Sequence, residues 1–254
     1  MIIVNKRLGE TPLQALERFR AEMIEKEPAK ATFWRATPMT YAGRLDPMAE
    51  GALLILIGEE CKNKEKYLGL DKEYEVEIVF GISTDTYDAL GLVTKTGDEK
   101  KLARLDISKY IGKFSQEYPP YSSKTVGGKQ LHTLARAGEL PEEMPTKEVE
   151  IYSIEKISDD PTSGSIKKIS AQDLSSRITS TIDLVQGNFR QDEIKKRWQE
   201  LLATPEAKNQ LFYCLRLLVK CSSGTYMRSL ANRIGADAGT GAFALSIKRT
   251  QLFF

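Results

Sequence analysis

One carboxylate stands where a catalyst could be held at the edge of a core. Asp46 lies in the stretch TYAGRLDPMAEGALL, residues 40–54, and is followed by a proline and then by the apolar run GALLILIG. A carboxylate fixed in this way can act as a nucleophile or a base if it stays ionised. Burial raises the pKa of a carboxylate and a nearby arginine lowers it, so a catalytic aspartate calls for an arginine partner. On local sequence alone, a helix cap or a surface ion pair is the simpler explanation.

Two later segments supply side chains that would suit such a carboxylate. The segment SSGTYMRSLANRIG places Tyr226 and Arg228 at the start of a predicted helix, and DKEYEVEI places Tyr74 on a predicted strand. A flat tyrosine ring can stack on a planar ligand such as a nucleic-acid base. Taken separately, Tyr74 is explained equally well as a core aromatic residue and Arg228 as a surface cation.

The sequence lacks the residue patterns of metal sites, nucleotide-binding sites and serine or cysteine nucleophiles. The chain has 1 histidine, His132, and 3 scattered cysteines without a CxxC pair. A structural zinc site needs about four clustered ligands. Neither a GxGxxG motif nor a P-loop is present. His132 stands in a basic loop away from any serine or cysteine nucleophile motif, so a surface or structural role is its simpler explanation. We therefore expect neither a metal nor a cofactor.

The composition is that of a globular protein. Of the 254 residues, 41% are hydrophobic and 28% are charged, which allows a sizeable core. The net charge of +2 neither demands nor excludes nucleic acid, because a binding face needs only a local cluster of cations. No signal peptide is visible, and the longest apolar run, 51–58, is far shorter than the roughly 20 residues that span a bilayer. We expect a soluble cytoplasmic protein.

The apolar pattern predicts more strands than helices. Strands are predicted within 1–10 and over 51–58, 71–81, 147–158, 211–224 and 242–254. Helices are predicted over 11–27, 59–70, 107–120 and 225–239, the first with Thr11 as N-cap and Pro12 in its first turn. Because strands and helices rarely alternate, we expect an α+β fold with a mixed, mostly antiparallel central sheet flanked by helices and loops.

Two segments interrupt this pattern. Residues 121–139 indicate a basic hairpin or loop that leads into a short helix ending near Gly138. Residues 159–209 are rich in serine, aspartate, lysine and glutamine, and their periodicity is weak. We interpret this second segment as an insertion with one helix over 192–203.

Four motifs together resemble the TruB-type tRNA pseudouridine synthases. The Asp46 stretch resembles the family pattern G-x-L-D-P-x-A-x-G-x-L around the nucleophilic aspartate, and K-x-Y with T-D-T-x-D-x-x-G follows it. A P-P-x-Y-S thumb motif and a closing G-T-Y-I-R-x-L motif complete the set. Four motifs in the family's order argue against chance. They occupy 41–62, 71–93, 119–139 and 221–250.

The resemblance implies a role for each motif residue. Asp46 matches the catalytic aspartate, and Arg228 matches the arginine that pairs with it. Tyr74 matches the tyrosine that stacks on the target base and helps to remove its C5 proton. Tyr226 is expected beside the flipped nucleotide, and Ile247 in the wall of the uracil pocket.

The chain also departs from the family pattern near the RNA. Tyr41 replaces a histidine and can stack on a base but carries no positive charge. Arg44 replaces a small residue or threonine, so that GRLD resembles the R-L-D of RluA-type synthases. Phe243 replaces a second histidine, and Lys124 is displaced by one position. Including these positions, the residues expected to bind substrate are Tyr41, Arg44, Lys72, Tyr226, Ile247, Lys124, His132, Lys248 and Arg249; Lys6 is expected on phosphate or as a structural cation.

The implied protein is a single catalytic domain over 1–254. It has a thumb-like loop around 119–146, an insertion around 159–209, and no C-terminal PUA-like RNA-binding domain. The resemblance implies a monomer without a cofactor that converts uridine 55 in the T arm of tRNA to pseudouridine. The alternatives are a synthase for ribosomal or other RNA, and a non-catalytic tRNA-binding or folding protein. A carboxylate glycosidase would need a second acidic motif opposite Asp46, and none comparable is present.

Overall fold

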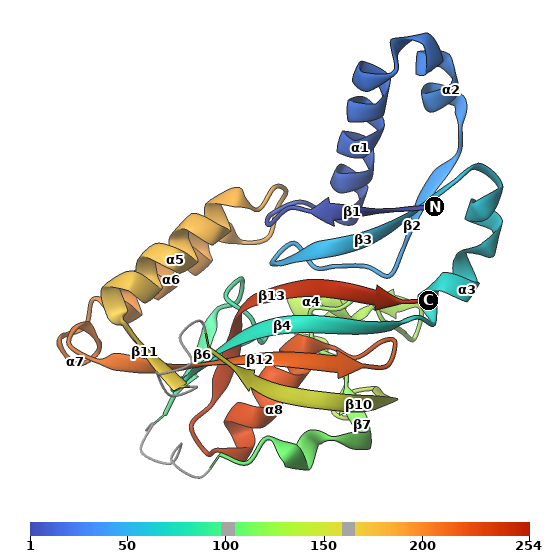
Figure 1. Ribbon diagram of the computed structural model, residues 1–254. Helices are drawn as coiled ribbons and strands as arrows, with labels where there is room; N and C mark the ends of the chain where they lie inside the picture. The colour runs from blue at the N-terminus through green and yellow to red at the C-terminus, as the bar shows by residue number, and fades with distance from the viewer. Residues whose placement is uncertain (98–104, 159–165) are drawn as a thin grey trace.

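A computed structural model describes the protein over residues 1–97, 105–158 and 166–254. Most of its strands belong to one nine-stranded sheet (Figure 1). In spatial order the path is β1 (Ile2–Lys6), β3 (Ala49–Ile57), β13 (Ala242–Phe253), β4 (Asp71–Phe80), β12 (Leu211–Cys221), β10 (Thr146–Ile157) and β7 (Gly112–Glu117). Two further strands join it, β2 (Met39–Ala42) on β3 and β11 (Ile166–Ser170) on β12.

The sheet is mixed and mostly antiparallel. Neighbouring strands pair antiparallel except β3 and β13, which pair in parallel. All six predicted strands are present, as β1, β3, β4, β10, β12 and β13, and the expected α+β class and sheet type are confirmed. Alternation explains the agreement: Tyr74, Val76 and Ile78 of β4 are buried, whereas the glutamates between them are partly exposed.

Helix α8 (Met227–Asp237) covers one face of the sheet. Leu230 and Ile234 on this helix pack against Val76 and Ile78 of β4 in the larger hydrophobic core. The helix therefore begins at the predicted place, with Tyr226 as its N-cap residue. This packing fixes the first turn of α8, which carries Arg228, relative to the middle of the sheet.

The segment interpreted as an insertion is helical and packs on the opposite face. It forms α5 (Ala171–Leu184), α6 (Gln191–Leu202) and the short α7 (Pro205–Lys208), beside the end of the sheet where β11 lies (Figure 1). Trp198 of α6 has no exposed surface and packs on Phe243 of β13, with the rings tilted by 51° and their centroids 5.1 Å apart. The predicted helix over 192–203 is α6, while α5 was not predicted; residues 159–165 lie outside the described residues.

The prediction of a helix over 107–120 was wrong. A 3₁₀ turn, η4 (Ser108–Tyr110), comes first, and β7 follows it. Gly112, the first residue of β7, has φ of +105°, a conformation that cannot continue a helix. In β7 the backbone is extended, so Gln116 is buried while its neighbours Ser115 and Glu117 are exposed.

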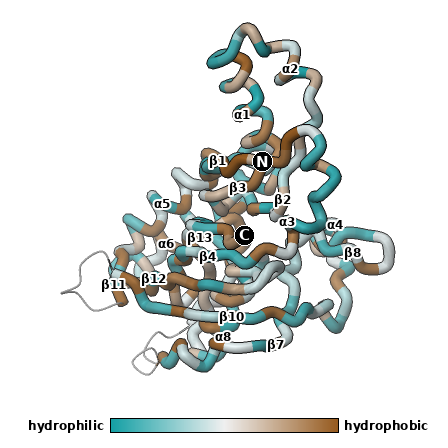
Figure 2. Tube along the Cα trace, turned by 45° about the vertical axis from the view of Figure 1, so that its right-hand side comes forward, coloured by the Kyte–Doolittle hydropathy of each residue, from teal (hydrophilic) through white to brown (hydrophobic). Residues whose placement is uncertain are grey.

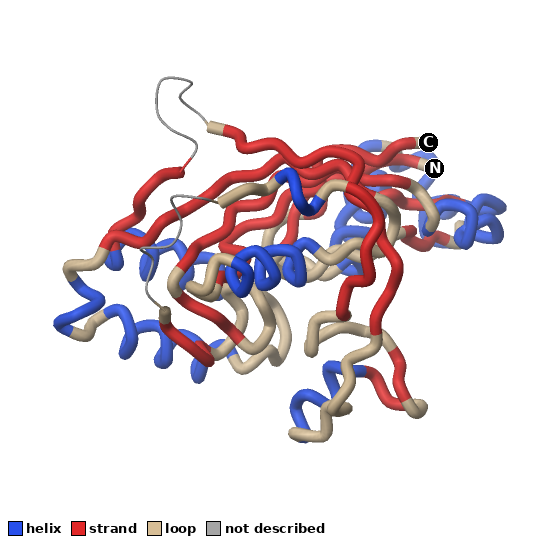
Figure 3. The backbone as a smooth tube through the Cα atoms, turned by 90° about the horizontal axis from the view of Figure 1, so that it is seen from below, coloured by secondary structure: helices blue, strands red, loops and turns tan. Residues whose placement is uncertain are grey.

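Between β7 and β10 the chain leaves the sheet and forms the thumb. It contains a hairpin, β8 (Thr125–Val126) with β9 (Lys129–Gln130), and helix α4 (Leu131–Ala137). The helix ends at Gly138, whose φ of 71° is the left-handed value typical of a C-cap. Seen from below, the thumb extends away from the sheet at the end of two long strands (Figure 3).

The N-terminal helices project beyond the β1 edge of the sheet, opposite the edge formed by β7 (Figure 1). Helix α1 (Pro12–Lys26) begins with a capping box, in which Thr11 and Gln14 bond each other's backbone N–H. A turn, η1 (Pro28–Lys30), leads to α2 (Ala31–Ala36). Beyond β3, η2 (Gly58–Asn63) leads to α3 (Lys64–Leu68), which is largely hydrophilic in Figure 2.

A small second sheet pairs β5 (Ile82–Thr84) with β6 (Val93–Thr96), and the loop between them holds part of the T-D-T-x-D-x-x-G motif. None of the helices described is long and apolar enough to span a membrane.

Replacement of Trp198 tests whether α6 belongs to the core. Its indole N–H donates to the Ala89 carbonyl at 3.2 Å, and its ring is fully buried. We expect Trp198→Ala to lower the free energy of unfolding in urea by about 3–5 kcal/mol. Lys196→Ala on the exposed side of the same helix is the control and should change it by less than about 0.5 kcal/mol. Equal effects of the two substitutions would contradict this packing.

Candidate active site

A cavity of about 710 Å³ opens where the sheet, the thumb and the start of α8 meet. This volume is in the range of small-molecule and cofactor sites. Its walls come from segments far apart in the sequence. They include the Asp46 turn, β4, the loop after β5, the thumb, the connection between α5 and α6, and residues 223–228.

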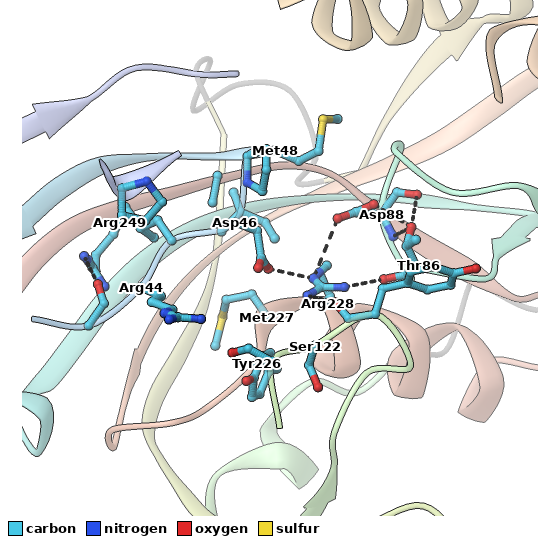
Figure 4. A pocket seen from close by; sticks show the side chains of 18 of the residues that line it. Arg44, Asp46, Met48, Thr86, Asp88, Ser122, Tyr226, Met227, Arg228 and Arg249 are labelled. Atoms are coloured by element: carbon cyan, nitrogen blue, oxygen red, sulfur yellow. Dashed lines mark hydrogen bonds and ion pairs between the residues drawn. The ribbon is translucent and has the colours of Figure 1, made fainter. Parts of the chain in front are cut away.

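Asp46 and Arg228 form an ion pair at the centre of this cavity (Figure 4). Arg228 Nε donates to Asp46 Oδ2 at 2.8 Å. The arginine side chain is 3% exposed, whereas the aspartate side chain is 40% exposed. Asp46 therefore presents a reachable carboxylate to the cavity and does not cap a helix, since it lies in the turn between β2 and β3.

Both terminal nitrogens of Arg228 also donate hydrogen bonds. Nη1 donates to the Thr86 carbonyl at 2.9 Å, and Nη2 donates to the Tyr121 carbonyl at 3.3 Å. A second carboxylate, Asp88, places Oδ2 at 3.7 Å from Nε. Hydrogen bonds to the loop after β5 and to the thumb thus fix the guanidinium plane in the orientation in which Nε faces Asp46.

Asp88 is a residue of this site that the sequence analysis does not single out. It is buried, and its carboxylate approaches the same Arg228 nitrogen as Asp46 does (Figure 4). Its Oδ1 accepts from the Thr86 hydroxyl at 2.6 Å and from the Leu90 N–H at 3.0 Å. Burial raises the pKa of Asp88 from 3.8 to about 6, against the lowering effect of Arg228. Asp88 is the second aspartate of the T-D-T-x-D-x-x-G motif, and this position in the motif could have identified it from the sequence.

The loop that carries Asp88 is held in an uncommon conformation. Tyr87 has φ of 65°, the left-handed region that tyrosine rarely adopts. Its N–H donates to the Thr84 carbonyl at 3.3 Å, and its carbonyl accepts from the Ala244 N–H at 3.0 Å. These bonds turn Thr86 and Asp88 toward the same arginine.

Tyrosine and isoleucine side chains form the apolar part of the cavity. Tyr74 on β4 is 7% exposed and Ile247 on β13 is 6% exposed, and both line the cavity. Tyr226 also lines the cavity and meets Tyr118 of the thumb edge to face, with ring centroids 5.5 Å apart. Burial, and then the charge of Asp46, raise the pKa of Tyr226 to about 12. Its hydroxyl is therefore a neutral donor at pH 7.

Two buried cations line the same cavity. The Lys72 amine donates to the carbonyls of Leu68 and Leu70, and burial lowers its pKa to about 8. Arg249 donates from Nη2 to the Gly43 carbonyl at 3.0 Å. Gly51 permits this arrangement, because a Cβ there would lie 2.2 Å from the Arg249 carbonyl oxygen. The close approach ties β13 to the strand that leaves the Asp46 turn.

Three other predicted residues also line the cavity. Arg44 is exposed and Tyr41 is partly buried, with the Lys64 ammonium 5.5 Å from its ring centroid. His132 in the thumb donates its backbone N–H to the Ser122 carbonyl at 3.0 Å, and its Nδ1 lies 3.2 Å from the same oxygen. These contacts fix His132 within the thumb.

Three predicted cations lie elsewhere. Lys248 is exposed on the opposite face of β13, because strand alternation turns it away from Ile247 and Arg249. Lys124 is exposed on the thumb, with its ammonium 5.2 Å from the Tyr118 ring centroid. Lys6 is fully buried and donates to the Ala49 carbonyl at 2.5 Å, which is the position of a structural cation.

Comparison with known proteins gives the family. A family model described as "TruB family pseudouridylate synthase (N terminal domain)" matches residues 32–172. The chain belongs to this TruB family. The membership expected from the four motifs is thereby confirmed, and the Asp46 turn, Tyr74 and Asp88 all lie inside the matched range.

Several curated TruB relatives carry the name tRNA pseudouridine synthase B. The protein of Aquifex aeolicus is 26% identical over 255 residues, covering 99% of this chain and 67% of its own length. That of Clostridioides difficile is 32% identical over 216 residues, covering 83% and 55%. That of Saccharophagus degradans is 30% identical, covering 99% and 62%. The chain thus spans between about half and two thirds of these relatives.

A solved structure supports the fold. A chain in "Structure of H/ACA RNP bound to a substrate RNA containing 2'-deoxyuridine" aligns with 98% of this chain and 47% of its own. The TM-score is 0.50 and the sequence identity is 15%. The pseudouridine synthase fold expected from sequence is therefore confirmed.

The raised pKa of Asp88 predicts a dependence of stability on pH. Between pH 3.8 and about 6 the folded protein holds the Asp88 proton more tightly than the unfolded chain does, so the free energy of unfolding contributed by this group falls as pH rises. One such group contributes at most about 1.4 kcal/mol per pH unit. We expect Asp88→Asn to remove this fall in urea unfolding measured from pH 4 to 6.

Asp192→Asn on α6 is the matched control, since that side chain is fully exposed. This variant should keep the fall in unfolding free energy between pH 4 and 6. A parallel curve for Asp88→Asn would show that Asp88 does not titrate in this window.

Proposed function

We propose that this chain converts uridine to pseudouridine in tRNA, with uridine 55 of the T arm as its target. One observation carries the proposal: in a TruB family member, the exposed carboxylate of Asp46 is paired with the buried Arg228 in a cavity walled by Tyr74 and Ile247. The relatives' name, tRNA pseudouridine synthase B, supports tRNA as the substrate.

The reaction balances without a co-substrate. The bond between N1 of uracil and C1′ of ribose breaks, the uracil turns, and a bond between C5 and C1′ forms. C5 gives up its proton and N1 gains one, so the product is an isomer of the substrate and no electrons are added or removed. Asp46 acts as the nucleophile or base in this sequence, and Arg228 holds it ionised and oriented by a charge-assisted hydrogen bond.

The cavity supplies what a displaced base needs. An enzyme that acts on a base inside folded RNA must first take that base out of its stack. The flat ring of Tyr74 and the side chain of Ile247 offer it a new stacking surface and an apolar wall. Tyr226 carries a neutral hydroxyl in the cavity wall, which can donate a hydrogen bond to the nucleotide.

Cations at the cavity suit the RNA backbone. Arg44 is exposed, and Lys72, Arg136 and Arg249 lie in the walls. Neutralising phosphates with such side chains releases counterions, so affinity should fall with added salt. Because burial lowers the pKa of Lys72 to about 8, the free protein should also bind RNA less tightly as pH rises through that value.

The role of Asp46 can be tested by an isosteric change. Asp46→Asn keeps the size of the side chain but removes its charge and nucleophilicity. We expect pseudouridine formation to fall to background, measured by tritium release from C5-labelled uridine in RNA, while RNA binding is largely retained. The neighbouring Glu50→Gln is the control and should turn over normally. Full turnover by Asp46→Asn would rule out the assigned role.

The substrate can be tested with a T-arm stem-loop. We expect purified protein to form pseudouridine at the position equivalent to uridine 55, and to form none when cytidine stands there.

A second candidate, a synthase for ribosomal RNA, is favoured by Arg44, which gives GRLD its likeness to R-L-D. Unmodified stem-loop together with a ribosomal site lost in a deletion strain would select this second candidate.

A further inference from the structure

The connection between α5 and α6 reaches the cavity from the segment interpreted as an insertion. Phe189 and Arg190 of this connection line the cavity. The Asn188 carbonyl accepts from Arg136 Nη2 of the thumb at 2.9 Å, and the Gln186 side chain accepts from Gln14 of α1 at 2.6 Å. The connection therefore touches both the thumb and the N-terminal helix at the edge of the site.

Arg190 is held in an unusual backbone conformation. Its φ of 63° and ψ of 28° are left-handed, which is uncommon for a residue other than glycine and is retained where surrounding contacts determine it. Gln191 fixes the backbone around it. The Gln191 side chain accepts from the Phe189 N–H at 2.8 Å and donates to the Val185 carbonyl at 3.1 Å. This geometry directs the Arg190 side chain into the cavity wall.

The guanidinium of Arg190 joins two segments. It pairs with Asp85 Oδ2 at 2.9 Å, with both side chains 22% exposed, and its Cζ lies 4.5 Å from the ring centroid of Tyr121. The other carboxylate oxygen of Asp85 accepts from the Leu92 N–H at 2.8 Å. Only a planar cation can pair with a carboxylate at its edge and stack on a ring with its face, so lysine is a poor substitute.

The two segments that Arg190 contacts also contact Arg228 of the central ion pair directly. The Tyr121 carbonyl accepts from Arg228 Nη2, and Asp85 precedes Thr86, whose carbonyl accepts from Arg228 Nη1. Arg190 thus binds the side chains of two segments whose backbone carbonyls hold Arg228. It does so from a helical segment that the sequence motifs do not include.

We propose that Arg190 is a positioning residue, which fixes the thumb at Tyr121 and the loop at Asp85 so that Arg228 is held in register with Asp46. The proposal rests on the proposed function for its effect on turnover. Loss of Arg190 would leave Asp46 and the stacking surface in place but let Arg228 shift relative to them. The expected consequence is a loss of turnover with little loss of RNA affinity.

Steady-state kinetics with the T-arm stem-loop can separate an effect on kcat from an effect on KM. We expect Arg190→Gln to lower kcat by about tenfold or more, since small misplacements of catalytic groups have effects of this size, and to change KM by less than about twofold. Arg190→Lys should recover only part of the loss, and Tyr121→Leu should reproduce it. Arg177→Gln is the matched control, because Arg177 on α5 forms an ion pair with Glu77 outside the cavity. It should turn over normally.

A second measurement does not depend on activity. Hydrogen exchange of residues 119–138 should be several-fold faster in Arg190→Gln than in the wild type, and unchanged in Arg177→Gln. A raised KM with normal kcat would overturn the proposal by making Arg190 an RNA contact. Equal exchange in Arg190→Gln and the wild type would overturn it even if the protein modified no RNA; faster exchange together with absent turnover in the wild type would reject the proposed function alone.

Discussion

A buried arginine charge is the constraint on which the rest of the structure depends. Arg228 is 3% exposed, and a buried cation is tolerated only when it is paired and its hydrogen bonds are satisfied. Its partners come from the Asp46 turn, the loop with Thr86 and Asp88, and the thumb at Tyr121. The sheet brings these segments together, and α8 delivers the arginine between them. The geometry of the Asp46–Arg228 pair and the packing of the core are therefore parts of the same arrangement.

Most strands of the sheet and the start of α8 could be predicted from the sequence, because local hydrophobic patterns determine them. Alternation in β4 and β13 marks which side chains are buried, whereas the association of Asp46 with Tyr74 and Arg228 follows from the resemblance to the family and not from local pattern. The limit of local pattern is visible at Lys248. It belongs to the same motif as Ile247 and Arg249, yet the strand places it on the opposite face of the sheet.

What could not be predicted depends on long-range contacts. Asp88 lies in a polar loop and resembles a surface residue until Arg228, far along the chain, is placed beside it. Helix α5 buries Leu174, Ile178 and Ile182 at four-residue spacing, but the serines and threonines among them weaken the helical signal. The same segment then contributes Arg190 to the cavity wall, which nothing in its composition indicates.

The parallel pairing of β3 with β13 has a consequence for when the cavity can exist during synthesis. Arg249 bonds the Ala52 carbonyl, 197 residues earlier in the chain, and β13 also separates β3 from β4. A nascent chain that ends before β13 lacks both Ile247 and the strand that joins the Asp46 turn to the Tyr74 strand. Contacts of such long sequence separation form late and slowly. Synthesis must therefore proceed through β13 before the walls of this cavity can be completed.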